Sequence, residues 1–420
     1  MKFIRAQSQV LSNRLAEPVA RIQIVAGPRQ VGKSTLVRQT LESWNSDDFT
    51  SVATETGGSD GIGIESGARV FRASAKRDAE WLIDVWSRSR AVAKQRGQRH
   101  VLVVDEIQKI SQWSEIVKGL WDADRAAGVD MHVVLLGSAP LLLQKGLAES
   151  LAGRYEIIRM THWSLAEMQE AFDFSLEEFI YFGGYPGSAS LIKDEDRWRD
   201  YVIASLIQPN IEKDILQMAR VEKPALLKLL FELGCRYSGQ ILALTKLRGQ
   251  LEDAGNVTTL ADYLHLLSQA GLLTGLQKFA MQPVRQRASP PKLNVLNTAL
   301  MTARSGYTFG EAEADRAFWG RLIESAVGAH LINSADQNLQ VSYWRQSPFE
   351  VDFVLSTQNR IQAIEVKSGK FSGSAPGLEK FQTHFPAAKS LVVGDTKECD
   401  ISIAEFLTYP AAHWVSADAN

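Results

Sequence analysis

Apolar positions follow different periods along this chain, and the changes between them predict its elements. Three mostly apolar runs end in polar residues: IQIVAG (22–27), HVLVVDEIQ (100–108) and HVVLLGSAP (132–140). Such runs are typical of strands buried on both faces of a parallel sheet. Residues 34–44 and 79–97 instead show helical spacing. Strands that alternate with helices predict a three-layer α/β domain over residues 20–160.

The middle of the chain changes from helices alone to helices followed by strands. Residues 163–230 have helical spacing throughout. Two short helices and then two strands are predicted after them, at 241–255, 258–270, LLTGLQKF (272–279) and VRQRASPPK (284–292). Two helices followed by a strand pair is the order of a winged helix.

The C-terminal segment has the order helix, three strands, helix, strand. The predicted elements are GRLIESAVGAHLI (320–332), LQVSYWRQ (339–346), FEVDFVL (349–355), RIQAIEVKS (360–368), LEKFQTHFP (378–386) and SLVVGD (390–395). This order matches a restriction-endonuclease-like core. A period of two places Glu350 and Asp352 on one face of their strand, opposite the apolar residues Phe349, Val351, Phe353 and Leu355.

A phosphate-binding loop follows the first predicted strand. GPRQVGKS (27–34) matches GxxxxGK[ST] in full and lies between a strand and a helix, which is the context that this motif needs. Backbone N–H groups of such a loop surround phosphates, Lys33 reaches the β and γ oxygens, and the Ser34 hydroxyl ligates Mg²⁺. ATP and Mg²⁺ are therefore the predicted cofactors. The predicted nucleotide-binding residues are Gly27, Pro28, Arg29, Gln30, Val31, Gly32, Lys33, Ser34, Thr35 and Asp105.

Two carboxylates end the second run, where ligands bind in open α/β sheets. Asp105 is placed to hold Mg²⁺, and Glu106 to orient and polarise an attacking water. The alternative is a strand that merely ends in solvated charge. Further along, Ser138 is a candidate γ-phosphate sensor or part of a Gly-Ser turn. Arg154 is a candidate arginine finger, in cis or toward a neighbouring subunit, or a surface arginine.

Charge is unevenly distributed along the chain. The net charge of −2 argues against a polyelectrolyte partner for nucleic acid as a whole. Residues 226–300, however, carry eight Lys or Arg against four Asp or Glu. Lys278, Arg285 and Arg287 are predicted on the wing, where they would meet DNA phosphates. A winged helix used for packing, with a solvated basic wing, is the alternative.

Three residues near the end of the chain form the pattern D-x(12)-E-x-K. Paired across a hairpin, Asp352, Glu365 and Lys367 would converge, with two carboxylates that hold Mg²⁺ and a lysine that orients water. Glu324, on the preceding helix, would add a metal ligand. A half-solvated hairpin with cross-strand ion pairs is the alternative.

Length and composition bound the class of protein. A chain of 420 residues is too long for one hydrophobic core. Its content of 45% hydrophobic and 22% charged residues is typical of soluble globular chains. Cys235 and Cys399 have no CxxC spacing, which argues against a disulfide framework or zinc site and favours the reducing cytoplasm. Neither a signal-peptide core nor a membrane-length apolar run occurs, so a membrane partner is not expected.

The motifs together resemble one widespread bacterial and archaeal family. Its members join an AAA+-type ATPase to a C-terminal half long labelled a domain of unknown function. The segments that carry the resemblance are GPRQVGKSTL, VVDEIQ, LLGSAPLLL, SLAGR, the GGYP turn, the winged-helix segment and EVDFVL…AIEVKSG. The resemblance implies ATP hydrolysis by a homo-oligomer or ring, Arg154 as finger or sensor, and a nuclease-like C-terminal domain. It also implies a role in genome maintenance or in defence against mobile elements.

The combined prediction is an α/β protein of four parts. These are an AAA+-like P-loop NTPase domain (1–162), a helical lid or linker (163–225), a winged helix (226–300) and a restriction-endonuclease-like α/β domain (305–420). The predicted function is that of a DNA-dependent ATPase on duplex, branched or broken DNA, with Mg²⁺-dependent nuclease activity as a hypothesis. The alternative is a regulatory or signalling ATPase whose C-terminal domain binds a protein partner and cleaves nothing.

Overall fold

The computed structural model of the chain divides into two compact units, residues 1–160 and 161–420. The described residues are 3–53, 77–97, 99–137, 150–216, 221–246, 257–281 and 289–416. Ser138, Arg285 and Arg287 lie outside them, so their predicted roles remain predictions. Among the described helices, none combines the length and the apolar character needed to span a bilayer.

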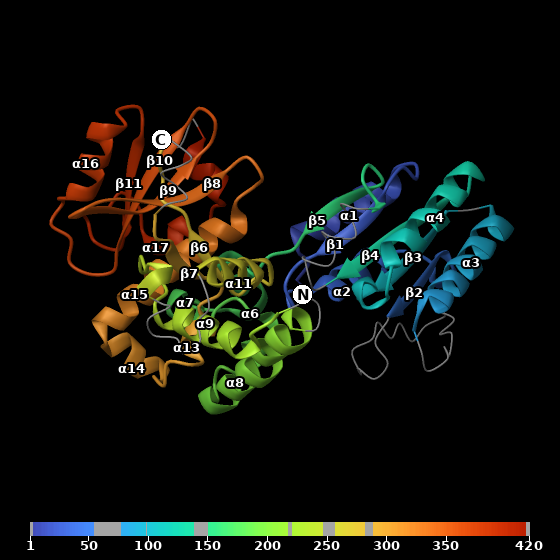
Figure 1. Cartoon of the computed structure of the whole chain (residues 1–420), viewed down its shortest axis with the longest axis horizontal. Coiled ribbons are helices and arrows are strands. Elements are labelled where there is room, and N and C mark those ends of the chain that lie inside the picture. Colours follow the sequence, from blue (N-terminus) through green and yellow to red (C-terminus); the bar gives the residue numbers. More distant parts are fainter. Residues whose placement is uncertain are drawn as a thin grey trace. The chain divides into compact units, whose positions relative to one another are not determined.

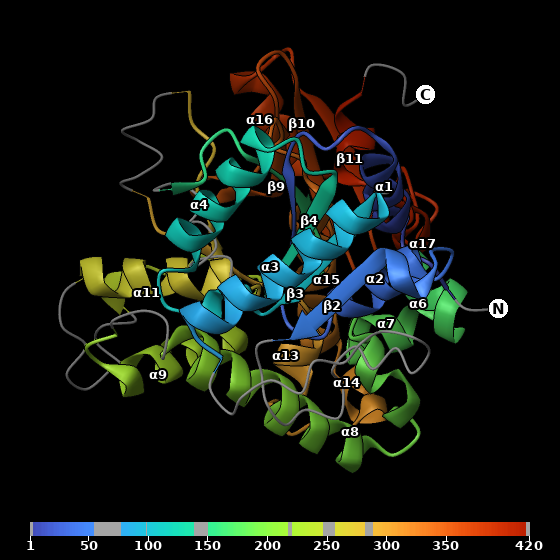
Figure 2. The same cartoon turned by 90° about the vertical axis from the view of Figure 1, so that its right-hand side faces the viewer.

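The first unit is built on a parallel sheet with the strand order β2-β3-β4-β1-β5 (Figures 1 and 2). Its strands are β1 (Ile22–Ala26), β2 (Phe49–Ala53), β3 (His100–Asp105), β4 (Met131–Gly137) and β5 (Tyr155–Arg159). Its helices are α1 (Ala6–Ala16), α2 (Lys33–Leu41), α3 (Ala79–Arg96) and α4 (Trp113–Ala126), with 3-10 turns at Ser46–Asp48 and Ile107–Lys109.

Helices cover both faces of this sheet. Trp86 of α3 and Val117 of α4 share one buried cluster with Leu102 of β3. Leu15 of α1 and Val37 of α2 belong to a second cluster on the opposite face. The central strands are apolar at most positions because alternate residues enter the two clusters. The predicted three-layer α/β domain is therefore confirmed.

The second unit contains helices of very different lengths and two sheets. The helices are α6 (Leu165–Phe172), α7 (Leu176–Phe182), α8 (Glu195–Tyr201), α9 (Pro224–Arg236), α11 (Val257–Gln269), α13 (Ala299–Thr302), α14 (Phe309–Ala314), α15 (Arg316–Ser334), α16 (Pro376–His384) and α17 (Ile403–Phe406). Shorter 3-10 and π turns lie at Pro186–Leu191, Val202–Ile207, Asn210–Ile215 and Ala411–Val415.

The strands of the second unit form a hairpin and a four-stranded sheet. The hairpin pairs β6 (Leu273–Leu276) with β7 (Lys292–Val295) in antiparallel register. The C-terminal sheet has the order β11-β10-β9-β8, from β8 (Gln340–Gln346), β9 (Phe349–Ser356), β10 (Ile361–Lys367) and β11 (Lys389–Gly394). Only the β10–β11 pair is parallel, because α16 crosses over between these two strands. The predicted order of elements in this segment is found.

Two corrections concern these strands. The return strand of the hairpin begins at Lys292, where the predicted segment 284–292 ends. The predicted uniform face of β9 is wrong, because Val351 packs in the cluster that holds α16, whereas Phe353 and Leu355 pack in the cluster that holds α15. The cause is a bulge. Pairing of β8 with β9 shifts by one residue between Ser342 and Trp344, so that β9 carries an extra residue at this point.

The β6–β7 hairpin is joined to the C-terminal sheet by backbone and side chain. The Phe279 N–H donates to the Tyr343 carbonyl (2.6 Å), and the Tyr343 N–H donates to the Gln277 carbonyl (3.1 Å). Tyr343 is the β8 residue that the bulge leaves without a partner on β9. The Phe279 ring is buried with Phe381 and Phe385, at centroid distances of 5.8 Å and 5.1 Å. The hairpin is therefore part of the packing of the second unit.

Candidate nucleotide site and carboxylate cluster

The Ser34 hydroxyl and the Asp105 carboxylate meet at one edge of the first sheet. Ser34 lies in the first turn of α2, and Asp105 ends β3. Their side chains form a 2.7 Å hydrogen bond across 71 residues of sequence. Because the strands are parallel, the carboxyl ends of β1 and β3 lie at the same edge, which brings the two predicted Mg²⁺ ligands together.

The loop between β1 and α2 closes tightly around the Lys33 side chain. The ammonium is buried and donates to the carbonyls of Gly27 (2.9 Å) and Pro28 (2.7 Å). Gly27 cannot be replaced without a shift, because a Cβ there would lie 2.0 Å from the Met160 carbonyl oxygen. Gly32 caps α2 with a φ of 90°, a left-handed conformation that favours glycine. The loop thus has the geometry of a phosphate cradle, with hard oxygen donors beside it that suit Mg²⁺.

Glu106 is held in a defined position next to this loop. Its backbone is left-handed, with a φ of 54°, and its N–H donates to the Asp105 carboxylate (2.8 Å). The buried Gln108 amide donates to the Glu106 carboxylate (2.6 Å). Gln108 therefore orients Glu106. Gln108 has no role in the sequence prediction, although its place two residues after the carboxylate pair is a usable signal.

Arg154 lies at the opposite edge of the sheet. Its carbonyl accepts from the Ile22 N–H (2.8 Å) at the start of β1, whereas the phosphate loop follows the end of β1. The strand between these points spans about 13 Å, farther than an arginine side chain reaches. In this structure the guanidinium therefore does not reach the phosphate loop of its own chain. The guanidinium forms two hydrogen bonds with Asp122 of α4 (2.7 Å and 2.9 Å) at the protein surface.

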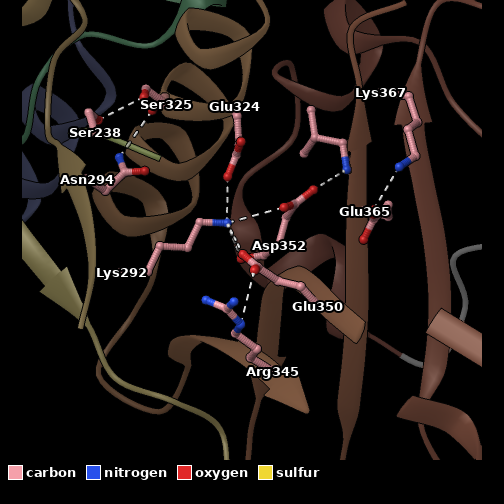
Figure 3. Close-up of polar contacts among 11 residues, drawn as sticks. Ser238, Lys292, Asn294, Glu324, Ser325, Arg345, Glu350, Asp352, Glu365 and Lys367 are labelled. Atoms are coloured by element: carbon pink, nitrogen blue, oxygen red, sulfur yellow. Dashed lines mark hydrogen bonds and ion pairs between the residues drawn. The ribbon is translucent and has the colours of Figure 1, made fainter. Parts of the chain in front are cut away.

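A second cluster of charge lies in the C-terminal sheet of the second unit, and its centre is Lys292. The Lys292 ammonium is 2.5 Å from the Glu324 carboxylate, 3.2 Å from that of Asp352 and 3.8 Å from that of Glu350. The lysine side chain is fully buried, at 0% exposure. Figure 3 shows the ammonium pointing between these carboxylates. Lys292, one of the eight basic residues of the segment 226–300, is therefore not available at the protein surface.

The predicted catalytic residues of the hairpin β9–β10 are only partly brought together. Asp352 comes one step beyond the last paired residues and thus stands opposite Glu365. The second oxygen of Asp352 accepts from the Val366 N–H (2.9 Å). Glu365 instead pairs with Lys367 (2.8 Å), two residues along its own strand (Figure 3). Within the described part of the chain, no group of three or more His, Cys, Asp or Glu side chains is placed to hold a metal ion.

Burial and like charge shape the electrostatics of this cluster. Burial, with the neighbouring Asp352 charge, raises the pKa of Glu324 and of Glu365 to about 7 each. Burial opposes the charged form of Lys292, but the Asp352 and Glu324 carboxylates outweigh it and raise the pKa of the lysine above its ordinary value. Lys292 is therefore a cation at neutral pH. Lys292 and Glu350 have no site role in the sequence prediction, because neither stands in a recognisable motif.

Comparisons with known proteins place the first unit in a known class. Residues 19–169 match the family described as AAA domain. Residues 173–309 and 319–412 match two families described as domains of unknown function, DUF8612 and DUF4143. No curated protein matches the chain.

Solved structures with partial similarity include a Walker-type ATPase of Pyrococcus abyssi. It is 13% identical, with a TM-score of 0.49, and the alignment covers 72% of this chain and 95% of that one. A RuvB mutant of Thermotoga maritima is 17% identical over 67% and 91% of the two chains, with a TM-score of 0.32. An Orc1 protein of Aeropyrum pernix, solved with DNA, is 11% identical over 73% and 92%, with a TM-score of 0.28.

The AAA domain match agrees with the P-loop, the five-stranded parallel sheet and the Ser34–Asp105 contact. The first unit is an AAA-type P-loop domain, and the protein is an ATPase.

Proposed function

We propose that this ATPase is an ATP-dependent DNA-processing protein that works as a homo-oligomer. The observation that carries the nucleotide chemistry is the Ser34–Asp105 hydrogen bond beside the phosphate loop. In this proposal Lys33 binds the β and γ phosphate oxygens, and Glu106 orients the attacking water. Ser34 and Asp105 would hold Mg²⁺, which supplies charge neutralisation at the phosphates.

The position of Arg154 supports an oligomer. An arginine at the edge of the sheet opposite its own phosphate loop can complete only the site of a neighbouring copy, as a trans-acting arginine finger does. The Asp122 carboxylate holds the guanidinium extended at the surface until such a copy binds. Such a head-to-tail contact of identical subunits, each donating Arg154 to the next, forms a ring when its rotation closes.

The order of elements in the second unit supports a DNA-related role. α9, the Ile241–Lys292 bridge, α11 and the β6–β7 hairpin follow the winged-helix order. The series α15-β8-β9-β10-α16-β11 follows the order of restriction-endonuclease-like folds. On this basis we infer that the second unit contacts duplex, branched or broken DNA.

One observation favours the alternative of a regulatory ATPase whose second unit binds a protein. The hairpin is used for packing, through Phe279 and Tyr343, and Lys292 is sequestered from the surface. These contacts leave Phe279 and Lys292 inside the second unit, where DNA does not meet them. The two functions make different demands on ATP turnover, because only a DNA-processing protein couples hydrolysis to DNA.

The test is the rate of ATP turnover with single-stranded, duplex and junction DNA at several protein concentrations. We expect at least one DNA form to increase turnover, and we expect turnover per chain to rise with concentration. Lys33→Ala, which removes the phosphate partner, and Glu106→Gln, which keeps the binding site, are the controls for contaminating activity. A rate indifferent to every DNA form, together with tight capture of a protein, would favour the regulator.

A further inference from the structure

Lys292 reaches the carboxylate cluster from outside the C-terminal sheet. It is the first residue of β7, whereas Glu324 lies on α15 and Asp352 on β9. The ammonium is within 4 Å of three carboxylates and also donates to the Asp352 backbone carbonyl (3.2 Å). It further lies 4.9 Å from the centre of the Phe353 ring. Oxygens therefore surround one cation at close range.

Several independent contacts fix this position. Lys292 pairs with Leu276 in the hairpin and with Ile241 in an isolated bridge. Two residues further along β7, the Asn294 amide donates to the Ser325 carbonyl (3.2 Å) on α15, next to Glu324. Since β7 is tied to both β6 and α15, the Lys292 side chain has no freedom to withdraw while the hairpin stays docked.

The β9 bulge supplies the complementary half of the contact. Bulges leave a residue out of the regular strand pairing and re-aim its side chain, often next to functional sites. Here the extra residue falls in the stretch between Val351 and Val354. The Asp352 carbonyl is thereby free to accept from Lys292, and its two carboxylate oxygens bind Lys292 and the Val366 N–H.

A divalent metal does not fit this arrangement. Mg²⁺ requires oxygen ligands at about 2.0–2.1 Å, and the oxygens of Glu324 and Asp352 that would supply them already contact the ammonium. A lysine charge at this distance also repels a second cation. One oxygen of Glu365, the remaining predicted ligand, is engaged with Lys367, and its other oxygen is buried without a hydrogen-bond partner among the described residues.

We propose that Lys292 is a built-in cation that takes the place of a divalent metal among Glu324, Glu350 and Asp352. The cluster then latches the β6–β7 hairpin onto the C-terminal sheet and is not the centre of a metal-dependent nuclease. This inference concerns the second unit alone and holds whether or not DNA stimulates ATP turnover.

The first experiment measures Mn²⁺ binding to the full chain by electron paramagnetic resonance. Ser34→Ala removes metal binding at the nucleotide site, and the chain with this substitution is compared with Ser34→Ala/Asp352→Asn. We expect the two chains to bind the same number of Mn²⁺ ions, because Asp352 is engaged with Lys292. One ion that is bound by the Ser34→Ala chain and lost with Asp352→Asn would overturn the proposal.

The second experiment removes the cation itself in the same Ser34→Ala background. Lys292→Met fills the space without charge, whereas Lys292→Ala opens it. Because an ion pair broken on one side leaves buried carboxylates unpaired, we expect each variant to lower Tm by roughly 10 °C. Mn²⁺ should then raise the Tm of Lys292→Ala but not that of Lys292→Met.

Two results of the second experiment would contradict the proposal. An unchanged or raised Tm in Lys292→Met would contradict the latch. A Tm of Lys292→Ala that Mn²⁺ does not raise would contradict the idea that the Lys292 ammonium takes the place of a metal ion. Adding Asp352→Asn to Lys292→Ala should abolish the rescue. The Mn²⁺ measurement needs no Lys292 variant, so it decides the question if those variants do not fold.

Discussion

The Ser34 hydroxyl lies 2.7 Å from the Asp105 carboxylate, although 71 residues separate the two in sequence. Neither α2 nor β3 by itself brings its side chain next to the other. The contact exists because β4 separates β1 from β3 in the sheet and the carboxyl ends of all three strands lie at one edge. It is the geometric basis of the first prediction.

Replacing Ser34 should weaken Mg²⁺-dependent turnover without harming the fold. Ser34→Ala removes a metal-ligating oxygen, and we expect Mg²⁺ affinity to fall by on the order of 100-fold. Ser34→Thr keeps the hydroxyl and is the matched control, expected to retain turnover. The measurement is the ATPase rate as a function of Mg²⁺ concentration. Equal Mg²⁺ dependence in all three chains would contradict the role of Ser34.

Arg154 should act between chains. Arg154→Ala is expected to reduce turnover by about 10³-fold or more, as loss of an arginine finger does. The fold should survive, since an exposed ion pair such as that with Asp122 contributes about 1 kcal/mol or less. The decisive measurement mixes Arg154→Ala with Lys33→Ala. Each chain is inactive alone, but the mixture contains intact loops facing intact arginines.

Recovered activity in that mixture would establish action in trans. Asp122→Ala is the control for a merely structural ion pair, because it breaks the same contact and leaves the guanidinium in place. We expect Asp122→Ala to retain turnover. A loss as large as that of Arg154→Ala would show that the pair matters for structure only.

The first unit should lose stability in mild acid. His100 and His132 are buried on adjacent strands, and burial lowers the pKa of each to about 4. As the pH falls below about 6.5, the histidines of the unfolded chain become protonated, whereas those of the folded unit stay neutral. The free energy of unfolding therefore decreases. Each histidine can account for roughly 3 kcal/mol between pH 6.5 and 4.

The measurement is urea denaturation at a series of pH values between these limits. His132→Asn removes one of the two titrating groups and should make the pH dependence shallower. A slope unchanged by this substitution would mean that other groups govern the acid sensitivity.

Phe279 should be essential to the docking of the hairpin. Its ring is 7% exposed and packs on Phe381 and Phe385. Phe279→Ala is expected to reduce the stability of the second unit by about 3–5 kcal/mol. Met281→Ala is the matched control, because that side chain is 75% exposed and two residues away. Thermal denaturation should separate the two variants, and similar Tm values would contradict the docking.

Local patterns were sufficient for much of the fold. The loop at 27–34, the carboxylates that end β3, and the order of strands and helices around Asp352 each depend on neighbours in sequence. A strand buried on both faces must be apolar at most positions, and a phosphate loop requires glycine at strained or crowded positions. Such requirements leave a signature that a single sequence carries.

The strand pairing could not be predicted to the same depth. A period of two assumes an uninterrupted strand, and the extra residue of the β9 bulge moves Phe353 and Leu355 to the opposite face from Val351. The shift arises from pairing with β8, and that partner lies outside the local pattern.

Sequence alone determined the phosphate loop of this ATPase, because a P-loop uses contiguous residues. Tertiary structure alone decided the places of Arg154 and Lys292. An arginine before a strand has no sequence signal that tells which edge of the sheet it occupies. A lysine is typically exposed, but strand register carries Lys292 into a cluster of carboxylates that are distant in sequence. There the Coulomb attraction of several acids outweighs the cost of burying its charge.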